Sequence, residues 1–123
     1  MGFRIIKPGS APRVSIEPGR GQTIRLVDAE SGTENLDVHL NVLVPGGPRG
    51  RVHRHTASEN VYIVKSGEGQ LTIEDEIYRI VADDVVFIPA GVRHSLSNVS
   101  DRQFVIYEIY APAGRAFDFV LDQ

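Results

Sequence analysis

The feature that most constrains the fold of this chain is its dense punctuation by glycine and proline. The two residue types recur at short intervals, in KPGSAP, EPGRG, VPGGPRG, KSGEG, PAG and APAG. Between them lie short runs rich in Val, Ile and Tyr, and some alternate apolar and polar residues, as in QLTIE and EIYRIV. Such alternation is typical of strands with one buried face. No long apolar stripe at helical spacing accompanies them, so the chain is predicted to be all-β.

Many short strands separated by turns predict a sandwich or a barrel. The tail GRAFDFVLDQ is read either as a short helix or as a last strand, and the N-terminal strands are expected to pair with the barrel or with a second subunit. The predicted strands share a β-branched or aromatic composition and span residues 23–27, 36–44, 60–65, 70–74, 77–81, 85–88 and 104–109.

Length and composition set further limits. A chain of 123 residues is long enough for one domain with its own core. The net charge of −3 and the lack of a basic cluster give no reason to expect a nucleic-acid partner. The sequence has no cysteine, no signal-peptide pattern and no apolar run long enough to span a membrane. These features lead us to expect a soluble, cytoplasmic protein without a membrane partner.

The histidines carry the clearest chemical signal. Two of the four stand one residue apart, at His53 and His55. In a strand these two imidazoles lie on one face, with Arg54 on the other, and can bind one metal ion. His94 is the best third donor, because His39 belongs to a separate predicted strand. An isolated pair of this kind is more often accidental, so its sequence context decides its meaning.

That context resembles the conserved motifs of the cupin family. Residues 47–67, GPRGRVHRHTASENVYIVKSG, are similar to the first cupin motif. Residues 89–98, PAGVRHSLSN, are similar to the second. The second motif usually opens with glycine, whereas this chain has Asp83, another residue that tolerates turns. The resemblance implies a double-stranded β-helix, or jelly-roll barrel, over residues 36–111.

Outside that range we expect an N-terminal strand region in residues 1–35, which packs on the barrel, and a tail in residues 112–123, all within one domain. The resemblance also implies a mononuclear metal site held by the three motif histidines and a motif-one carboxylate. Here the carboxylate position is ambiguous between Asn60 and Glu59. A regular strand that turns Glu59 inward would also bury Lys65, which favours Asn60 as the fourth ligand. Glu59 then becomes a residue at the rim or one that orients a histidine.

Several other residues are candidates for ligand contact or catalysis. Arg51 and Arg93 flank the histidines and could bind a carboxylate or phosphate, although surface ion pairs explain them as well. Tyr62 is predicted to face inward, either as a proton donor, a role also open to Glu59, or as simple packing. His39 and Asn41 alternate in LDVHLNVLV and either line the same cavity or occupy ordinary strand positions.

Nitrogen ligands suit Zn, Fe, Mn, Ni, Co or Cu, so one divalent transition metal is expected without a choice among these. The resemblance implies an enzyme acting on a small polar, anionic or neutral molecule, of the isomerase, dioxygenase, decarboxylase or lyase, or cyclase type. The alternative is a cupin that binds a sugar or organic acid without catalysis. A homodimer is the expected assembly, because symmetric dimers are the commonest oligomers.

Overall fold

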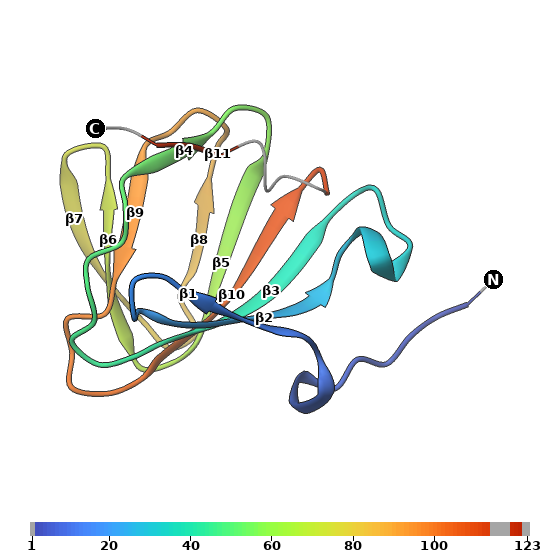
Figure 1. Ribbon diagram of the computed structural model, residues 1–123. Coiled ribbons are helices and arrows are strands. Elements are labelled where there is room, and N and C mark those ends of the chain that lie inside the picture. The colour runs from blue at the N-terminus through green and yellow to red at the C-terminus, as the bar shows by residue number, and fades with distance from the viewer. Residues whose placement is uncertain (1, 114–118, 122–123) are drawn as a thin grey trace.

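The computed structural model describes residues 2–113 and 119–121 (Figure 1). Within these ranges the helical elements are two short 3-10 turns, η1 (Pro8–Ser10) and η2 (Ala29–Ser31). All other regular elements are strands: β1 (Arg13–Ile16), β2 (Gly21–Val27), β3 (Asp37–Leu43), β4 (His53–His55), β5 (Glu59–Ser66), β6 (Glu68–Ile73), β7 (Glu76–Val81), β8 (Val85–Ile88), β9 (His94–Ser97), β10 (Phe104–Ala111) and β11 (Phe119–Leu121).

The strands form two antiparallel sheets that face each other (Figure 1). The large sheet has six strands in the order β1-β2-β3-β10-β5-β8, and the small sheet has five in the order β11-β4-β9-β6-β7. Neighbours in space are often distant in sequence, as in a jelly roll, and this architecture confirms the predicted double-stranded β-helix. No ladder joins the two sheets within the part of the chain that the structure describes, so the expected barrel is not closed.

The predicted strands agree well with the observed ones. β8 has the predicted bounds, and β3 and β5 differ from the predicted ranges by one residue at each end. β10 begins at the predicted residue and extends two residues further. Neither β1 nor β9 was among the predicted strands. The tail contributes the strand β11, while residues 114–118 and 122–123 lie outside the described residues.

The core fills the space between the inner faces of the two sheets. It is formed by Leu43, Tyr62, Val64, Leu71, Ile80, Ile88, Leu96, Phe104 and Ile106. Alternation along β10 turns Phe104 and Ile106 inward, and both are fully buried. Gly69 on β6 makes this packing possible, since a Cβ at that position would lie 2.3 Å from the Phe104 ring.

Two positions in the region of the second cupin motif, Asp83 and Asn98, have structural roles. Asp83 has a positive φ of 76°, a conformation that glycine adopts most readily, so this residue stands in the turn expected at the start of the second motif. Asn98 holds a loop: its Nδ2 donates to the carbonyls of Leu43 at 3.0 Å and Arg102 at 2.7 Å.

The N-terminal region is part of the large sheet. β1 pairs with β2, and β2 pairs with β3 along almost its whole length. Of the two expected arrangements, pairing within the same chain is therefore observed; pairing across a dimer remains a prediction. Within the described ranges, no helix has both the length and the apolar character needed to cross a bilayer.

Candidate metal site and cavity

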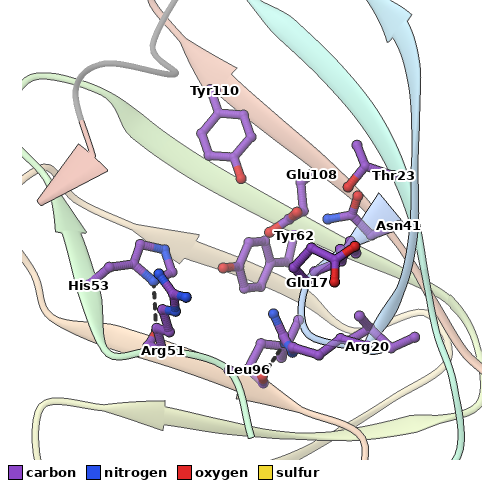
Figure 2. Close-up of a pocket in the computed structure, with 13 residues that line it drawn as sticks. Glu17, Arg20, Thr23, Asn41, Arg51, His53, Tyr62, Leu96, Glu108 and Tyr110 are labelled. Atoms are coloured by element: carbon purple, nitrogen blue, oxygen red, sulfur yellow. Dashed lines mark hydrogen bonds between the residues drawn. The ribbon is translucent and has the colours of Figure 1, made fainter. Parts of the chain in front are cut away.

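A cavity of about 360 Å³ lies between the two sheets (Figure 2). His53 and Arg51 line it from the small-sheet side, whereas Tyr62, Glu108 and Tyr110 line it from the large sheet. Other residues of the lining come from the first hairpin, from β3, from the segment before β4 and from β9; they are Ile16, Glu17, Arg20, Thr23, Asn41, Leu43, Gly50 and Leu96.

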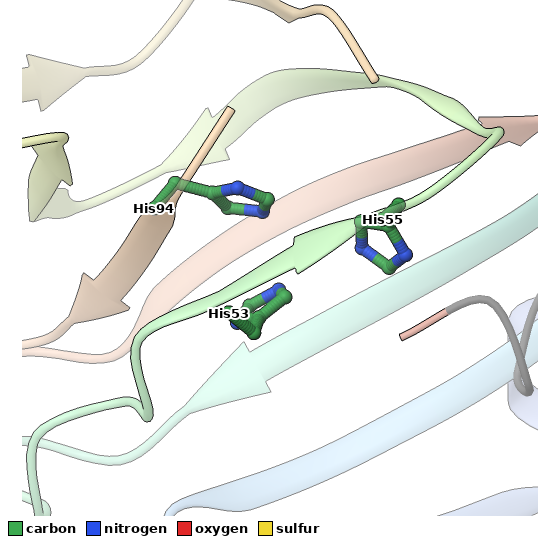
Figure 3. Close-up of side chains that lie close together, drawn as sticks. All are labelled: His53, His55 and His94. Atoms are coloured by element: carbon green, nitrogen blue, oxygen red, sulfur yellow. The ribbon is translucent and has the colours of Figure 1, made fainter. Parts of the chain in front are cut away.

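The three predicted histidines converge beside this cavity (Figure 3). Alternation along β4 puts His53 and His55 on one face, and the antiparallel pairing of β4 with β9 sets His94 directly opposite His53. The rings of His53 and His94 are 4.2 Å apart between centroids. Each histidine offers one nitrogen that lies within 4.8 Å of those of the other two. The topology thus assembles the three donors that the spacing predicted.

Hydrogen bonds to the backbone define the tautomers of two of these histidines. The Nδ1 of His53 lies 2.9 Å from the carbonyl oxygen of Arg51, and the Nδ1 of His94 lies 3.0 Å from that of Val92. A carbonyl can only accept, so each Nδ1 carries the proton and each Nε2 carries the lone pair. Backbone carbonyls commonly orient metal-binding imidazoles in this way.

Burial favours the neutral form of two of these imidazoles, those of His53 and His94. Burial and the neighbouring His94 lower the pKa of His53 to about 4, and burial lowers the pKa of His94 as well. Neutral imidazole is the form that coordinates metals. His94 is 1% exposed, and its Nε2 has no hydrogen-bond partner among the described residues. An orphaned buried nitrogen in a group of three imidazoles fits a transition-metal ion well.

The strand register places Asn60, not Glu59, on the inner face of β5. Asn60 is 1% exposed and shares this face with Tyr62, whereas Glu59 is exposed. Neither Oδ1 nor Nδ2 of Asn60 makes a hydrogen bond of normal geometry to another described residue. Within the described ranges, the group of possible metal ligands consists of the three histidines, without Glu59. Asn60 therefore remains the candidate fourth donor.

The other candidates separate into two groups. Tyr62, Asn41 and Arg51 line the cavity, and Tyr62 is almost fully buried. His39 is half-buried and is not among the lining residues, although its ring lies 5.7 Å from that of Tyr110, which is. Arg93 forms an ion pair of 2.9 Å with Glu74 on the surface and does not line the cavity. Of the two interpretations of Arg93, ligand binding and a surface ion pair, the structure shows the ion pair.

Sequence reasoning missed three charged residues of the cavity, Glu17, Arg20 and Glu108. Glu108 lies on β10 and is 7% exposed. Arg20 follows β1 in the turn before β2, and its Nη2 donates to the Leu96 carbonyl at 2.7 Å. A lone acidic residue in the apolar run FVIYEIYA was the available signal for Glu108. No local pattern marks Arg20, because its position depends on long-range pairing.

Comparison with known proteins decides the family. Residues 39–110, which include both histidine motifs, match the sequence profile of the cupin domain family Cupin_2. The chain belongs to the cupin family. An uncharacterized protein from Methanocaldococcus jannaschii is 26% identical to this cupin over 97 residues, which is 79% of this chain and 69% of that protein.

Solved structures agree on the fold. A variant of Streptomyces PAC13 with uridine superposes with a TM-score of 0.77 at 17% identity, covering 99% of this cupin and 92% of that chain. Lactobacillus farciminis oxalate decarboxylase, as a formate complex, gives a TM-score of 0.75 at 17% identity, covering 92% of this cupin and 34% of that chain. At such low identity the similarity establishes the cupin fold and leaves the reaction to be argued from the site.

Proposed function

We propose that this cupin is a metal-dependent enzyme that acts on a small polar molecule. His53, His55 and His94 would hold one divalent metal ion, with Asn60 as a weak fourth donor. The reaction would be of the isomerase, dioxygenase, decarboxylase or lyase, or cyclase type. One observation carries the proposal: three imidazole donors lie within 4.8 Å of one another beside a cavity of about 360 Å³.

The cavity is suited to small substrates. Its volume lies at the lower end of the range typical of ligand sites, and apolar and polar groups share its lining. Protein ligands limited to three imidazoles and one amide leave positions open for a substrate, as in catalytic metal sites. A bound divalent metal would supply Lewis-acid polarisation of a substrate oxygen. Structural neighbours support the substrate size, since one acts on oxalate and another binds uridine.

The test is the metal content of tag-free protein, measured by mass spectrometry. Wild-type protein is expected to hold close to one transition-metal ion per chain, and a His53→Ala/His94→Ala variant is expected to lose it. A matched control is His39→Ala, which removes a histidine outside the group and should keep the metal. Iron would direct the search to oxygenation, and zinc or manganese to isomerase or lyase chemistry.

The second candidate is a cupin that binds a sugar or an organic acid without transforming it. The polar lining of the cavity supports binding as much as catalysis. Protein that is purified without metal, and that also fails to take up added metal at neutral pH, would rule out the metalloenzyme and favour this alternative.

We also propose that the protein is a homodimer in solution. β8 lies at an edge of the large sheet, and its Val85 and Phe87 are 65% and 57% exposed. Adjacent large apolar side chains on a sheet edge are typical of association surfaces. Light scattering is expected to give the dimer mass, and Phe87→Arg should shift it to the monomer. A monomeric wild type at high concentration would contradict this assembly.

A cytoplasmic location stays a prediction from the sequence.

A further inference from the structure

The cavity wall facing the histidines contains a buried carboxyl group. In the register of the large sheet, Glu108 lies directly opposite Tyr62 on β5 and His39 on β3. Its side chain is 7% exposed and lines the cavity together with Tyr62 and Tyr110 (Figure 2). A buried carboxyl group destabilises the fold unless it is neutral or compensated, so its position calls for a functional explanation.

A guanidinium group lines the same cavity and acts electrostatically on this carboxyl group. Arg20 reaches into the cavity from the turn between β1 and β2, where its Nη2 donates to the Leu96 carbonyl and its Nε donates to that of Pro48 at 3.3 Å. Gly50 makes room for it, since a Cβ there would lie 2.8 Å from Nη2. A guanidinium has five N–H donors, so these two bonds leave others for an anionic ligand.

The carboxyl group can hold or release a proton near neutral pH. Burial raises the pKa of Glu108 to about 7, while hydrogen bonds from the Tyr62 and Tyr110 hydroxyls and the charge of Arg20 act in the opposite direction. Burial raises the pKa of both tyrosines well above the ordinary value, so they stay protonated. Other charged and titratable groups lie on the neighbouring elements. His39 is the partner of Glu108 on β3, and Glu17, Arg51 and His53 line the same cavity.

We propose that Arg20 and Glu108 form a subsite for the carboxylate group of a small anionic ligand, and that Glu108 takes up a proton when this ligand binds. The ligand carboxylate pairs with the Arg20 guanidinium and accepts a hydrogen bond from the Glu108 carboxylic acid. An ionised Glu108 would instead repel it, so binding favours the protonated form. The solvent supplies the proton. In the proposed enzyme, Glu108 is then placed to exchange that proton with the substrate. This assignment deepens the proposed function and rests on it for the catalytic step alone.

Calorimetric titration of oxalate into metal-loaded protein tests the subsite. Oxalate is a small dianion that stays ionised between about pH 5.5 and about pH 8.5, and buffers of different ionisation enthalpy reveal proton uptake. At about pH 8.5, oxalate binding is expected to be accompanied by the uptake of close to one proton per site. The affinity of the wild type should fall about tenfold per pH unit above 7. Glu108→Gln should abolish the uptake and flatten this profile.

Two further variants test the guanidinium, and one serves as a control. Arg20→Met should weaken oxalate binding at every pH by at least about tenfold. Arg20→Lys should restore part of the affinity, because it keeps the charge but not the planar fork. Glu76→Gln alters an exposed glutamate on β7 and should behave as the wild type. Thermal melts and metal content on the same samples establish that each variant is folded and loaded.

Each outcome bears on the proposal. Proton uptake that persists in Glu108→Gln would overturn the role of Glu108, and unchanged affinity in Arg20→Met would overturn that of Arg20. No oxalate binding to loaded wild type would overturn the subsite itself. Protein that holds no metal, yet binds oxalate with uptake that depends on Glu108, would keep the subsite and refute the metal site. The two proposals can therefore fail separately.

Discussion

Replacement of Glu108 by glutamine is expected to change how the stability of the protein depends on pH. In the folded protein the pKa of Glu108 is raised from 4.5 to about 7. Between these values the folded state holds a proton that the unfolded state has lost. The stabilisation from the protonated carboxyl is therefore complete below pH 4.5, and it disappears as the pH rises through 7.

The size of the effect follows from the shift. Each pKa unit corresponds to about 1.4 kcal/mol, so the shift of Glu108 corresponds to about 3 kcal/mol of unfolding free energy. Glutamine has nearly the same shape and does not titrate. The unfolding free energy of Glu108→Gln, measured relative to that of the wild type, should therefore rise by about 3 kcal/mol from pH 4.5 to pH 7.5.

Urea unfolding of both proteins across this range provides the assay. The histidines act in the opposite sense: the pKa of His53 is lowered to about 4, so its stabilisation is lost as the pH falls below 6.5. Because both proteins keep these histidines, the difference between the two curves isolates Glu108. A difference that stays constant from pH 4.5 to 7.5 would refute the argument that burial holds a proton on this carboxyl group.

Other predictions concern packing, loop anchoring and the surface. Gly69→Ala should destabilise the protein by about 1–3 kcal/mol, since its Cβ would overlap the Phe104 ring, and a Phe104→Leu background should reduce this loss; equal losses in both backgrounds would contradict the packing argument. Asn98→Ala removes the two hydrogen bonds that Nδ2 donates to the Leu43 and Arg102 carbonyls and the two that Oδ1 accepts from Ser100, and it should cost about 1–3 kcal/mol in urea unfolding; unaltered stability would mean that the loop holds without them. Arg93→Ala breaks an exposed ion pair and should change neither the melting temperature nor the metal content; a loss of metal would assign Arg93 to the site after all.

The sequence predicted the strands that have one clear buried face or a strong β-branched composition. β5 and β8 are of this kind. β9 was not predicted because all four of its residues are buried. A strand that is covered on both faces shows no alternation of apolar and polar residues. β1 is short and mostly exposed, and pairing with β2 holds it in the sheet.

In the candidate site, too, residues with a local sequence signal could be predicted and the others could not. The convergence of His53, His55 and His94 could be predicted, because alternation along one strand and the order of two motifs are local properties of the sequence. Glu108 could not be placed, since both faces of β10 are apolar and only the pairing with β5 reveals which one it shares. Arg20 reaches the cavity through contacts with segments far along the chain, and no local rule anticipates these.

The turn that carries Arg20 has a consequence for how this protein can diversify. The three clustered histidines lie on β4 and β9, whereas this guanidinium belongs to a separate hairpin encoded by residues 13–27. Mutations or grafts in that hairpin can alter which molecules are accepted while the imidazole group is inherited intact. Variation among relatives, and libraries built to redirect this scaffold, should therefore be most productive near the first turn.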